Sequence, residues 1–472
     1  MRRLTGALLA LALAAAAPGP AHAEENDDLE RIPGAIEDPS RADPAGGVAP
    51  TASLGQRRLR LHLEDAAVLA LLRRPIVGFP PPAPPDWQNR TSFDGSNQWD
   101  LADGLTASLS DRLTWRETSD FGLGARRSAR NDFREGYLTW EPAGTVYLEA
   151  GRINLRNGIA LGFNPTDFFK ARTQVDQASL DPSAQSRNRL GTLMARAQGI
   201  WEAGSLSVAV APGLYSPSPL AAMRSAFDPG FERTNAADRL LLSASHDLAG
   251  LNPQLLAYRE GADMKTGLNL SRQLGQSVIA YAEWAGGSER PLIAEALAYG
   301  RRTGTLPASA PTLPPTTFDK RFRNDLALGA SWASALGFTT NLEYHYHQAG
   351  FSDADWRNWF AIGRARPGVP QVASELWYVR AFAADRQQPL TRQQMFLRAN
   401  MPDAFWRGLE LTALAFVDLT DGSSLAQLSA SYYLTNAWTI GAYVSANLGS
   451  PRSERGSLPQ AASAILQLVR YF

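Results

Sequence analysis

The sequence of 472 residues contains no cysteine and only five histidines. The absence of cysteine excludes disulfide bridges, thiol nucleophiles and thiolate metal sites. Lysine plus arginine and aspartate plus glutamate both number 46, so the formal net charge is zero. A balanced charge gives no reason to expect a nucleic acid as a partner. The chain also lacks the glycine motifs that bind phosphates or dinucleotides.

Long apolar runs are scarce as well, and the one that stands out begins the chain. Arg2 and Arg3 precede an apolar stretch from Leu4 to Ala17, and Ala21-His22-Ala23 follows it. This pattern predicts a signal peptide over residues 1–23. The alternative, an N-terminal membrane anchor, is disfavoured because a spanning helix needs roughly 20 apolar residues. The mature chain is therefore expected to be exported and either soluble or membrane-spanning as strands.

From about residue 98 onward, apolar side chains alternate with small or polar ones. Between Trp438 and Leu448 every second residue is apolar, including Ile440 and Val444, while Tyr443 belongs to the other set. Successive strand residues point to opposite faces, so one face suits lipid and the other suits water. The same parity recurs in 325–332, 338–347 and 407–418. The pattern predicts an all-β fold, a transmembrane antiparallel up-and-down β-barrel over residues 98–472.

The lengths of the connections separate a barrel from a soluble β-sandwich, which could show the same alternation. We expect about 16 strands, roughly 14–18, from one near 100–116 to one near 461–472. Every second connection is short, whereas those between are mostly long: 156–189, 213–237, 286–321 and 348–391. Outer-membrane barrels have short periplasmic turns, long external loops and an even number of strands. This sorting favours the barrel and predicts a periplasmic N-terminus.

The end of the chain carries an independent signal. Leu466, Leu468 and Phe472 share one face, and Phe472 is the last residue. This resembles the C-terminal signature of bacterial outer-membrane proteins and implies recognition by the barrel-assembly machinery. Arg470 departs from the signature because it lies on the lipid side, although a long side chain near a strand end can reach the interface. We expect this last strand to pair with the segment near 100–116.

The segment 24–97 is expected to be a short periplasmic arm. Residues 24–56 are rich in Pro, Gly, Ala and charge, a composition typical of poorly ordered chain. Residues 59–74 favour a short helix that stops at Pro75, and a Pro-rich linker follows at 80–85. A helix or strand that docks on the periplasmic mouth, or plugs it, is the simplest interpretation.

Inward-facing side chains would form the functional surface of the barrel. A barrel of about 16 strands encloses an aqueous channel unless loops fill it. Parity and the composition of the first long loop give these candidates for pore lining or constriction: Glu149, Arg152, Arg156, Asp167, Lys170, Arg172, Arg196, Glu283, Glu343, His345, His347, Arg398 and Glu410. An ion-selective pore would show rings of one sign. The mixed charges instead suit neutral or weakly charged solutes such as sugars, with an ordinary solvated wall as the alternative.

The first long loop, 156–189, is the most distinctive stretch of the sequence. Asn164-Pro165-Thr166-Asp167 predicts a turn, because Asn caps and Pro fixes φ, and Phe168-Phe169 would anchor the loop through apolar contacts. Folded inward, the loop would narrow the lumen and set selectivity. Packed outside, it would do neither, and both arrangements remain open.

Motifs for catalysis or metal binding are weak. His345 and His347 share a strand face with Glu343, so a metal site is sterically conceivable. Two histidines in a polar wall need no metal, however, and no catalytic partner can be assigned to any histidine. We expect no catalytic residue, no metal and no cofactor.

Gly151-Arg152, Gly158 and the segment Asn164–Phe169 resemble a broad group of bacterial outer-membrane porin-like barrels. The resemblance implies a channel for small hydrophilic solutes in the Gram-negative outer membrane, in contact with lipid and lipopolysaccharide. An export conduit for a polysaccharide or another polymer, working with periplasmic partners, is the first alternative. A non-conducting barrel enzyme or structural anchor is the second. Whether the chain forms a homotrimer stays open.

Overall fold

The computed structural model describes residues 59–74, 85–119, 125–214, 228–307, 313, 319–366 and 368–472. All of them belong to the compact unit Ile36–Phe472. The predicted signal peptide, residues 24–56 of the predicted arm and most of the Pro-rich linker lie outside the described residues. Within this part of the chain, no helix has the length and apolar character needed to cross a membrane.

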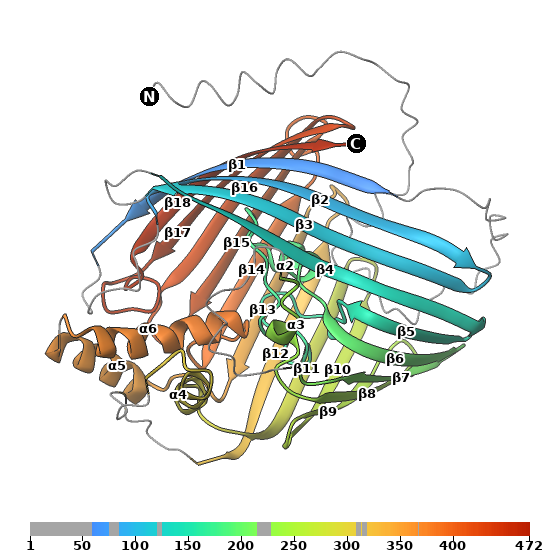
Figure 1. Ribbon diagram of the computed structural model, residues 1–472, viewed down its shortest axis with the longest axis horizontal. Coiled ribbons are helices and arrows are strands. Elements are labelled where there is room, and N and C mark those ends of the chain that lie inside the picture. Colours follow the sequence, from blue (N-terminus) through green and yellow to red (C-terminus); the bar gives the residue numbers. More distant parts are fainter. Residues whose placement is uncertain are drawn as a thin grey trace. The chain divides into compact units, whose positions relative to one another are not determined.

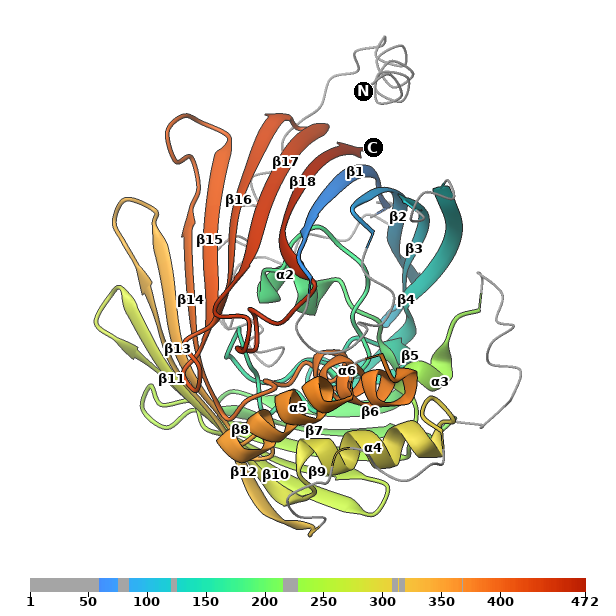
Figure 2. The ribbon, with the colours of Figure 1, turned by 90° about the vertical axis from the view of Figure 1, so that its left-hand side faces the viewer.

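The described residues form one antiparallel sheet of 18 strands that closes on itself (Figure 1, Figure 2). Each strand pairs with the next one along the chain, and β18 pairs with β1. Closure leaves no unpaired edge, as an up-and-down barrel requires. The strands are β1 (Arg60–Leu72), β2 (Trp87–Ala102), β3 (Leu105–Ser119), β4 (Ala125–Ala143), β5 (Val146–Ile153), β6 (Thr192–Trp201), β7 (Gly204–Ala211), β8 (Arg239–His246), β9 (Gln254–Glu260), β10 (Asp263–Leu274), β11 (Val278–Glu289), β12 (Arg321–Ala333), β13 (Thr339–His347), β14 (Gln393–Met401), β15 (Leu409–Asp418), β16 (Ser424–Thr435), β17 (Trp438–Leu448) and β18 (Gln460–Tyr471).

The strand count corrects the sequence-based expectation. Strands β3 to β18 lie where the alternation predicts them, but β1 and β2 precede them, so the count is 18, at the upper end of the expected 14–18 rather than about 16. The barrel begins at Arg60 rather than at residue 98, and β18 closes it against β1 rather than β3. The predicted helix at 59–74 is the strand β1. A short apolar run fits either structure by periodicity alone, and here the neighbours β2 and β18 bond both edges of the strand.

Strand β2 is hard to recognise in the sequence because polar residues occupy both of its faces. On one face, Asn89 and Thr91 donate hydrogen bonds to the Asp65 carboxylate at 3.2 and 2.6 Å. On the other, Arg90 donates to Glu64 at 2.6 Å. These cross-strand bonds satisfy polar groups that would otherwise oppose burial. The strand therefore forms without a clear alternation of apolar and polar residues.

The connections sort by length between the two ends of the barrel, as predicted. At the end where β1 begins and β18 finishes, every connection is short. The lengths run from two residues, as at 103–104, to seven residues, at 247–253 and 402–408. The long connections 154–191 and 348–392 lie at the opposite end, together with 212–238 and 290–320. We call these the short-turn end and the long-loop end.

The outward face of the barrel is apolar. Along β17, the outward residues Ile440, Val444 and Leu448 are 37, 56 and 52% exposed, whereas the inward Ser445 is 7% exposed. A bilayer requires this arrangement of a spanning barrel. Exposed tryptophans recur near the short-turn end, as an interfacial girdle would: Trp99, Trp140, Trp201, Trp332 and Trp406. Arg470 lies over the rings of Trp438 and Phe472, at 5.3 and 4.9 Å, which covers its charge with aromatic faces.

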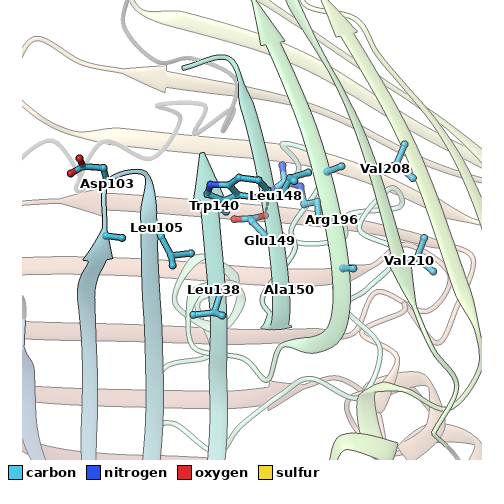
Figure 3. Close-up of a pocket in the computed structure, with 13 residues that line it drawn as sticks. Asp103, Leu105, Leu138, Trp140, Leu148, Glu149, Ala150, Arg196, Val208 and Val210 are labelled. Atoms are coloured by element: carbon cyan, nitrogen blue, oxygen red, sulfur yellow. Dashed lines mark hydrogen bonds and ion pairs between the residues drawn. The ribbon is translucent and has the colours of Figure 1, made fainter. Parts of the chain in front are cut away.

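A hollow of about 710 Å³ lies over β3–β7 (Figure 3). Its lining includes Leu138, Trp140, Val208 and Val210, which are exposed side chains of the outward face. The small side chain of Ala197 leaves room between them. The hollow is thus a feature of the outer surface and not of the lumen.

Helices occupy the long connections. They are α2 (Pro182–Arg187), α3 (Phe231–Thr234), α4 (Leu292–Arg302), α5 (Asp353–Ala365) and α6 (Pro370–Asp385). We call α4, α5 and α6 the helical cover, since they share an apolar cluster at the long-loop end. Arg380 of α6 is stacked against Trp356, Trp359 and Trp377 at 5.1–5.5 Å. It also donates to Ser457 Oγ and to the Glu454 carbonyl, at 2.7 and 2.6 Å, which fastens the cover to the β17–β18 connection.

Candidate functional site

The connection 154–191 between β5 and β6, which we call the inserted loop, folds into the barrel. Figure 2 shows its helix α2 surrounded by the strands. The loop reaches walls that are distant in sequence: Asp176 pairs with Arg90 of β2, and Leu180 N donates to Gln427 Oε1 of β16 at 2.9 Å. Of the two arrangements left open by the sequence, the inward one is present.

Two wall carboxylates hold the tip of the inserted loop. Glu283 of β11 accepts the backbone N–H groups of Ile159 and Ala160, the latter at 2.5 Å. Glu343 of β13 accepts those of Leu161 and Gly162 at 2.7 and 2.9 Å. We call Glu283 and Glu343 the carboxylate clamp. Four consecutive backbone donors are thereby satisfied by two ions, and such charge-assisted bonds are roughly twice as strong as neutral ones.

The clamp is shielded from bulk solvent. Both carboxylates are fully buried, at 0% exposure. Tyr281 OH donates to Glu343 at 2.7 Å, and Thr166 Oγ1 donates to Glu283 at 3.1 Å. The close approach of loop and wall also requires glycine at Gly162, where a Cβ would lie 2.6 Å from Cγ of Phe396.

His345 and His347 each pair with a carboxylate of the wall. His345 Nε2 lies 2.7 Å from Glu343, and His347 Nδ1 lies 2.7 Å from Asp325. Both rings pack edge-on against Phe163 of the inserted loop, with centroids 5.8 Å apart. Among the residues that the structure describes, no three His, Asp or Glu side chains are grouped closely enough to hold a metal ion. Through their contacts with Phe163, these two histidines hold the inserted loop against the wall.

The Asn-Pro-Thr-Asp segment forms the predicted turn. Asn164 Oδ1 accepts the backbone N–H groups of Thr166 and Asp167 at 3.2 and 2.8 Å. The Asp167 carboxylate pairs with Arg189 at 2.5 Å, which joins this turn to the end of the inserted loop. The expected apolar anchor is also present, because Phe168 stacks on Tyr258 at 4.5 Å. The residues of the motif thus shape the loop from within.

Lys170 is a buried cation beneath this turn. Its ammonium donates to the Asn164 carbonyl and lies 4.4 Å from the centroid of the Phe163 ring. Burial lowers the pKa of Lys170 from its ordinary value of 10.5 to about 8, and the negative charge of Asp167 opposes the shift. Keeping Lys170 charged inside the folded loop therefore costs folding free energy.

This shift predicts the pH dependence of stability. Between pH 8 and 10.5 the unfolded chain keeps the Lys170 proton and the folded chain loses it, so stability rises with pH in that window. We expect the melting temperature of the parent, relative to that of Lys170→Met, to increase from pH 7 to pH 10. A difference between the two proteins that stays constant over this range would contradict the prediction.

The other candidates predicted from sequence fall into three places. Arg172 bonds Tyr299 of α4, and Arg398 of β14 bonds Asp181 of the inserted loop at 2.8 Å. Glu149 and Arg196 pair with each other at 2.9 Å on the inward faces of β5 and β6. Of the remaining three, Glu410 accepts hydrogen bonds from Asn400 and Tyr433 on the wall, and Arg156 is exposed. Arg152 has a different environment.

Arg152 lies away from the inserted loop's interior. In the pairing of β5 with β6 it lies opposite Leu193, and it is on the same, outward face of the strand as Ala150. There it is 1% exposed, packs against Phe133 and Phe231, and donates to the carbonyls of Gly191 and Pro229. Its contacts hold the segment around α3 against β5.

Sequence reasoning missed a row of arginines on the inward faces of β2, β3 and β4. Arg90 and Arg112 share Glu64, at 2.6 and 3.3 Å. Arg112 and Arg134 share Asp94, at 3.4 and 2.9 Å. All of these side chains are buried. The alternation of Arg112 and Arg134 with apolar residues was the available signal, but the partners Glu64 and Asp94 lay in the segment assigned to the arm.

The inserted loop fills only one side of the lumen. Inward side chains of β11, β13 and β14, such as Glu283, His345 and Phe396, are 0% exposed beneath it. Inward side chains of β16 and β18, such as Ser431 and Gln467, stay partly exposed. No residue of α2 is buried, although the helix lies within the ring of strands. Solvent therefore reaches the space between α2 and the wall β16–β18.

No protein-family model and no curated protein matches the sequence. Similar solved structures are outer-membrane porins and channels. A triple mutant of the Rhodopseudomonas blastica porin has 10% identity, with 88% of this chain and 100% of the other covered and a TM-score of 0.39. Pseudomonas aeruginosa OpdK, solved with vanillate, has 9% identity, coverage of 88 and 98%, and a TM-score of 0.47. For P. aeruginosa OccK5 (OpdH) the values are 8%, 88 and 98%, and 0.49.

Proposed function

We propose that this chain is a porin-like channel of the Gram-negative outer membrane, which passes small hydrophilic solutes through a lumen narrowed by the inserted loop. The observation that carries the proposal is a closed barrel with an apolar outward face and a polar lumen that one loop fills on one side only. Eighteen strands enclose more space than side chains alone can fill. The partly exposed inward residues of β16–β18 support a water-filled remainder.

The location follows from the same features. An apolar outward face with tryptophans near its end suits a bilayer, and the sorted loops suit an orientation with the short-turn end in the periplasm. Export by a signal peptide over 1–23, contact with lipid and lipopolysaccharide, and assembly by the barrel-assembly machinery belong to this proposal. So does a homotrimer, which analytical ultracentrifugation in detergent would test.

The chemistry of the buried polar groups supports transport rather than catalysis. Glu283 and Glu343 are committed to holding the inserted loop, and His345 is paired with Glu343. We therefore propose that the chain is not an enzyme. The carboxylates act as acceptors for the loop backbone.

A plugged export conduit is the second candidate, favoured by one observation. The helical cover is fastened by Arg380 over the long-loop end, where it could close the lumen until a polymer or a periplasmic partner opens it. Such a conduit would be silent in its resting state. A channel for small solutes would conduct without any trigger.

Planar-bilayer recording of the purified full chain separates the two candidates. We expect discrete, stable openings from the parent protein. Silence that a deletion of 353–385, which removes α5 and α6 of the helical cover, relieves would contradict the channel and favour the conduit. Silence of both proteins, with the barrel shown to be folded by its heat-modifiable migration, would contradict transport of either kind.

A further inference from the structure

We propose that the wall formed by β5–β9, which we call the short wall, is the surface against which a second copy of this chain docks (Figure 1). The inference rests on the proposed outer-membrane barrel and names the interface of its homo-oligomer. Strands β5, β7 and β8 have eight residues each, β9 has seven and β6 has ten. A strand needs about 9–11 residues to cross a bilayer. Four of these five strands are therefore shorter than a crossing requires.

The apolar band of the short wall is lower still, because cations end it on the side of the long loops. On β5 the outward residues between Val146 and Ala150 are apolar, and the next outward residue is Arg152, which Phe231 of α3 covers. On β9, Leu255 and Ala257 are followed on the same face by Arg259. The band on β5 thus extends roughly 16 Å along the strand, at about 3.3 Å per residue. Membrane barrels have an apolar band about 25 Å tall.

A wall elsewhere in the barrel has the height that the short wall lacks. Along β17 the outward residues stay apolar from Trp438 to Leu448, which covers all 11 residues of the strand. A membrane protein whose apolar surface is too short for the bilayer either thins the bilayer around it or associates with another protein. The short wall therefore gains more from a protein neighbour than the wall at β17 does.

A depression on the short wall is suited to receive the side chains of a neighbour. The hollow of about 710 Å³ over β3–β7 is lined at β6 by Ala195 and Ala197, both exposed, and Trp140 and Val210 border it (Figure 3). At Gly199, the next outward residue of β6, an added Cβ would meet no atom within 4 Å. Small residues on β6 thus leave apolar space between larger side chains on both sides.

The same wall also offers a ridge. Leu240 and Leu242 of β8 and Leu255 of β9 are 42, 43 and 61% exposed, and β8 pairs with β7 at the border of the hollow. In a closed ring of identical copies, the ridge of one copy meets the hollow of the next. A second copy also has the same low apolar band, so docking covers both bands and leaves no apolar surface at the level of the lipid headgroups. This equal height favours a second copy over a partner with a full-height wall.

Photo-crosslinking of the full-length protein in the outer membrane tests the short wall directly. Benzoylphenylalanine in place of Val210 lies at the hollow, and benzoylphenylalanine in place of Val444 on β17 is the matched control, because the two valines are 51 and 56% exposed. We expect irradiation to give a product of twice the chain mass from position 210 and none from position 444. Mass spectrometry of that product should find peptides of this chain alone.

The other outcomes of this experiment overturn the inference. Crosslinks from position 210 to lipid alone would mean that the bilayer thins around the short wall. Crosslinks to a different protein would mean that the partner is not a second copy, and equal dimer yields from both positions would refute the choice of wall. The salt current of the same preparation judges the channel separately. A conducting protein without the crosslink keeps the proposed function, whereas a crosslinked protein without current contradicts the channel alone.

Filling the hollow gives a second test. Ala197→Trp should dissociate the oligomer, because the indole ring would occupy the space that the ridge of the neighbour enters. The matched control is Ala442→Trp, at an exposed outward alanine of β17. Analytical ultracentrifugation in mild detergent measures the masses, after heat-modifiable migration has shown that each barrel is folded. We expect the mass of one chain for Ala197→Trp and the mass of the parent oligomer for the control. A monomeric parent, or an Ala197→Trp variant with the parent's mass, would overturn the interface.

Discussion

Replacing Glu283 and Glu343 together with glutamine should raise the single-channel conductance by a factor on the order of two, because the tip of the inserted loop at 159–162 detaches from the wall. Each bond to a charged acceptor contributes about 1.5–3 kcal/mol, and the carboxylate clamp makes four of them to consecutive backbone N–H groups. A glutamine amide offers one neutral oxygen and turns an NH₂ group toward the same donors. The tip is therefore expected to detach, while the ion pairs of Asp176 and Asp181 still hold the rest of the loop.

The matched control is Glu410→Gln. Glu410 is also an inward carboxylate, but it accepts from Asn400 and Tyr433 of the wall. This variant should conduct as the parent does. Planar-bilayer recording measures both, after heat-modifiable migration has shown that each barrel is folded. A folded Glu283→Gln, Glu343→Gln double variant with the parent's conductance would refute the clamp.

Deleting residues 60–72 should abolish assembly of the barrel. When β1 is missing, its two neighbours β2 and β18 each expose a row of unpaired N–H and C=O groups. Every such group costs several kcal/mol in a bilayer. The ion pairs of Glu64 with Arg90 and Arg112 are lost as well, which leaves each buried guanidinium group with one carboxylate partner, Asp176 or Asp94, in place of two. We expect protease-sensitive protein that shows no heat-modifiable migration.

A deletion of 26–56, which lies outside the described residues, is the control and should leave the barrel folded. The two deletions together locate the start of the barrel. A folded, heat-modifiable barrel after removal of 60–72 would mean that β2 and β18 pair directly and that β1 is dispensable.

The sequence predicts most of the barrel because the outward face has to be apolar at every second residue. Val444 and Ser445 on β17 show this rule clearly, with 56 and 7% exposure. It fails at β1 and β2, where Asp65 on the outward side is bonded to Asn89 and Thr91. Hydrogen bonds between strands satisfy these polar groups, and such pairing is invisible until the partner strand is known.

The candidate site was predictable in its parts but not in its assembly. Parity gives the inward direction of Glu283 and Glu343, and composition gives the turn at Asn164. The clamp, however, joins Ala160 to Glu283 and Leu161 to Glu343, residues that only the closed barrel brings together. Arg152 shows the converse: it lies three positions after the inward-facing Glu149, so parity alone directs its side chain outward.

The position of the inserted loop inside a conducting lumen can be tested directly, because the chain has no native cysteine. In Ala184→Cys, the new thiol lies on α2, where no residue is buried. In the control Val444→Cys, it lies on the outward face, at a position that is 56% exposed.

The measurement is the single-channel current of each variant before and after a membrane-impermeant, cationic thiol reagent is added. We expect a stepwise, lasting fall in current for Ala184→Cys and none for Val444→Cys. An unchanged current in Ala184→Cys, with complete labelling shown by mass spectrometry, would contradict a loop inside the passage.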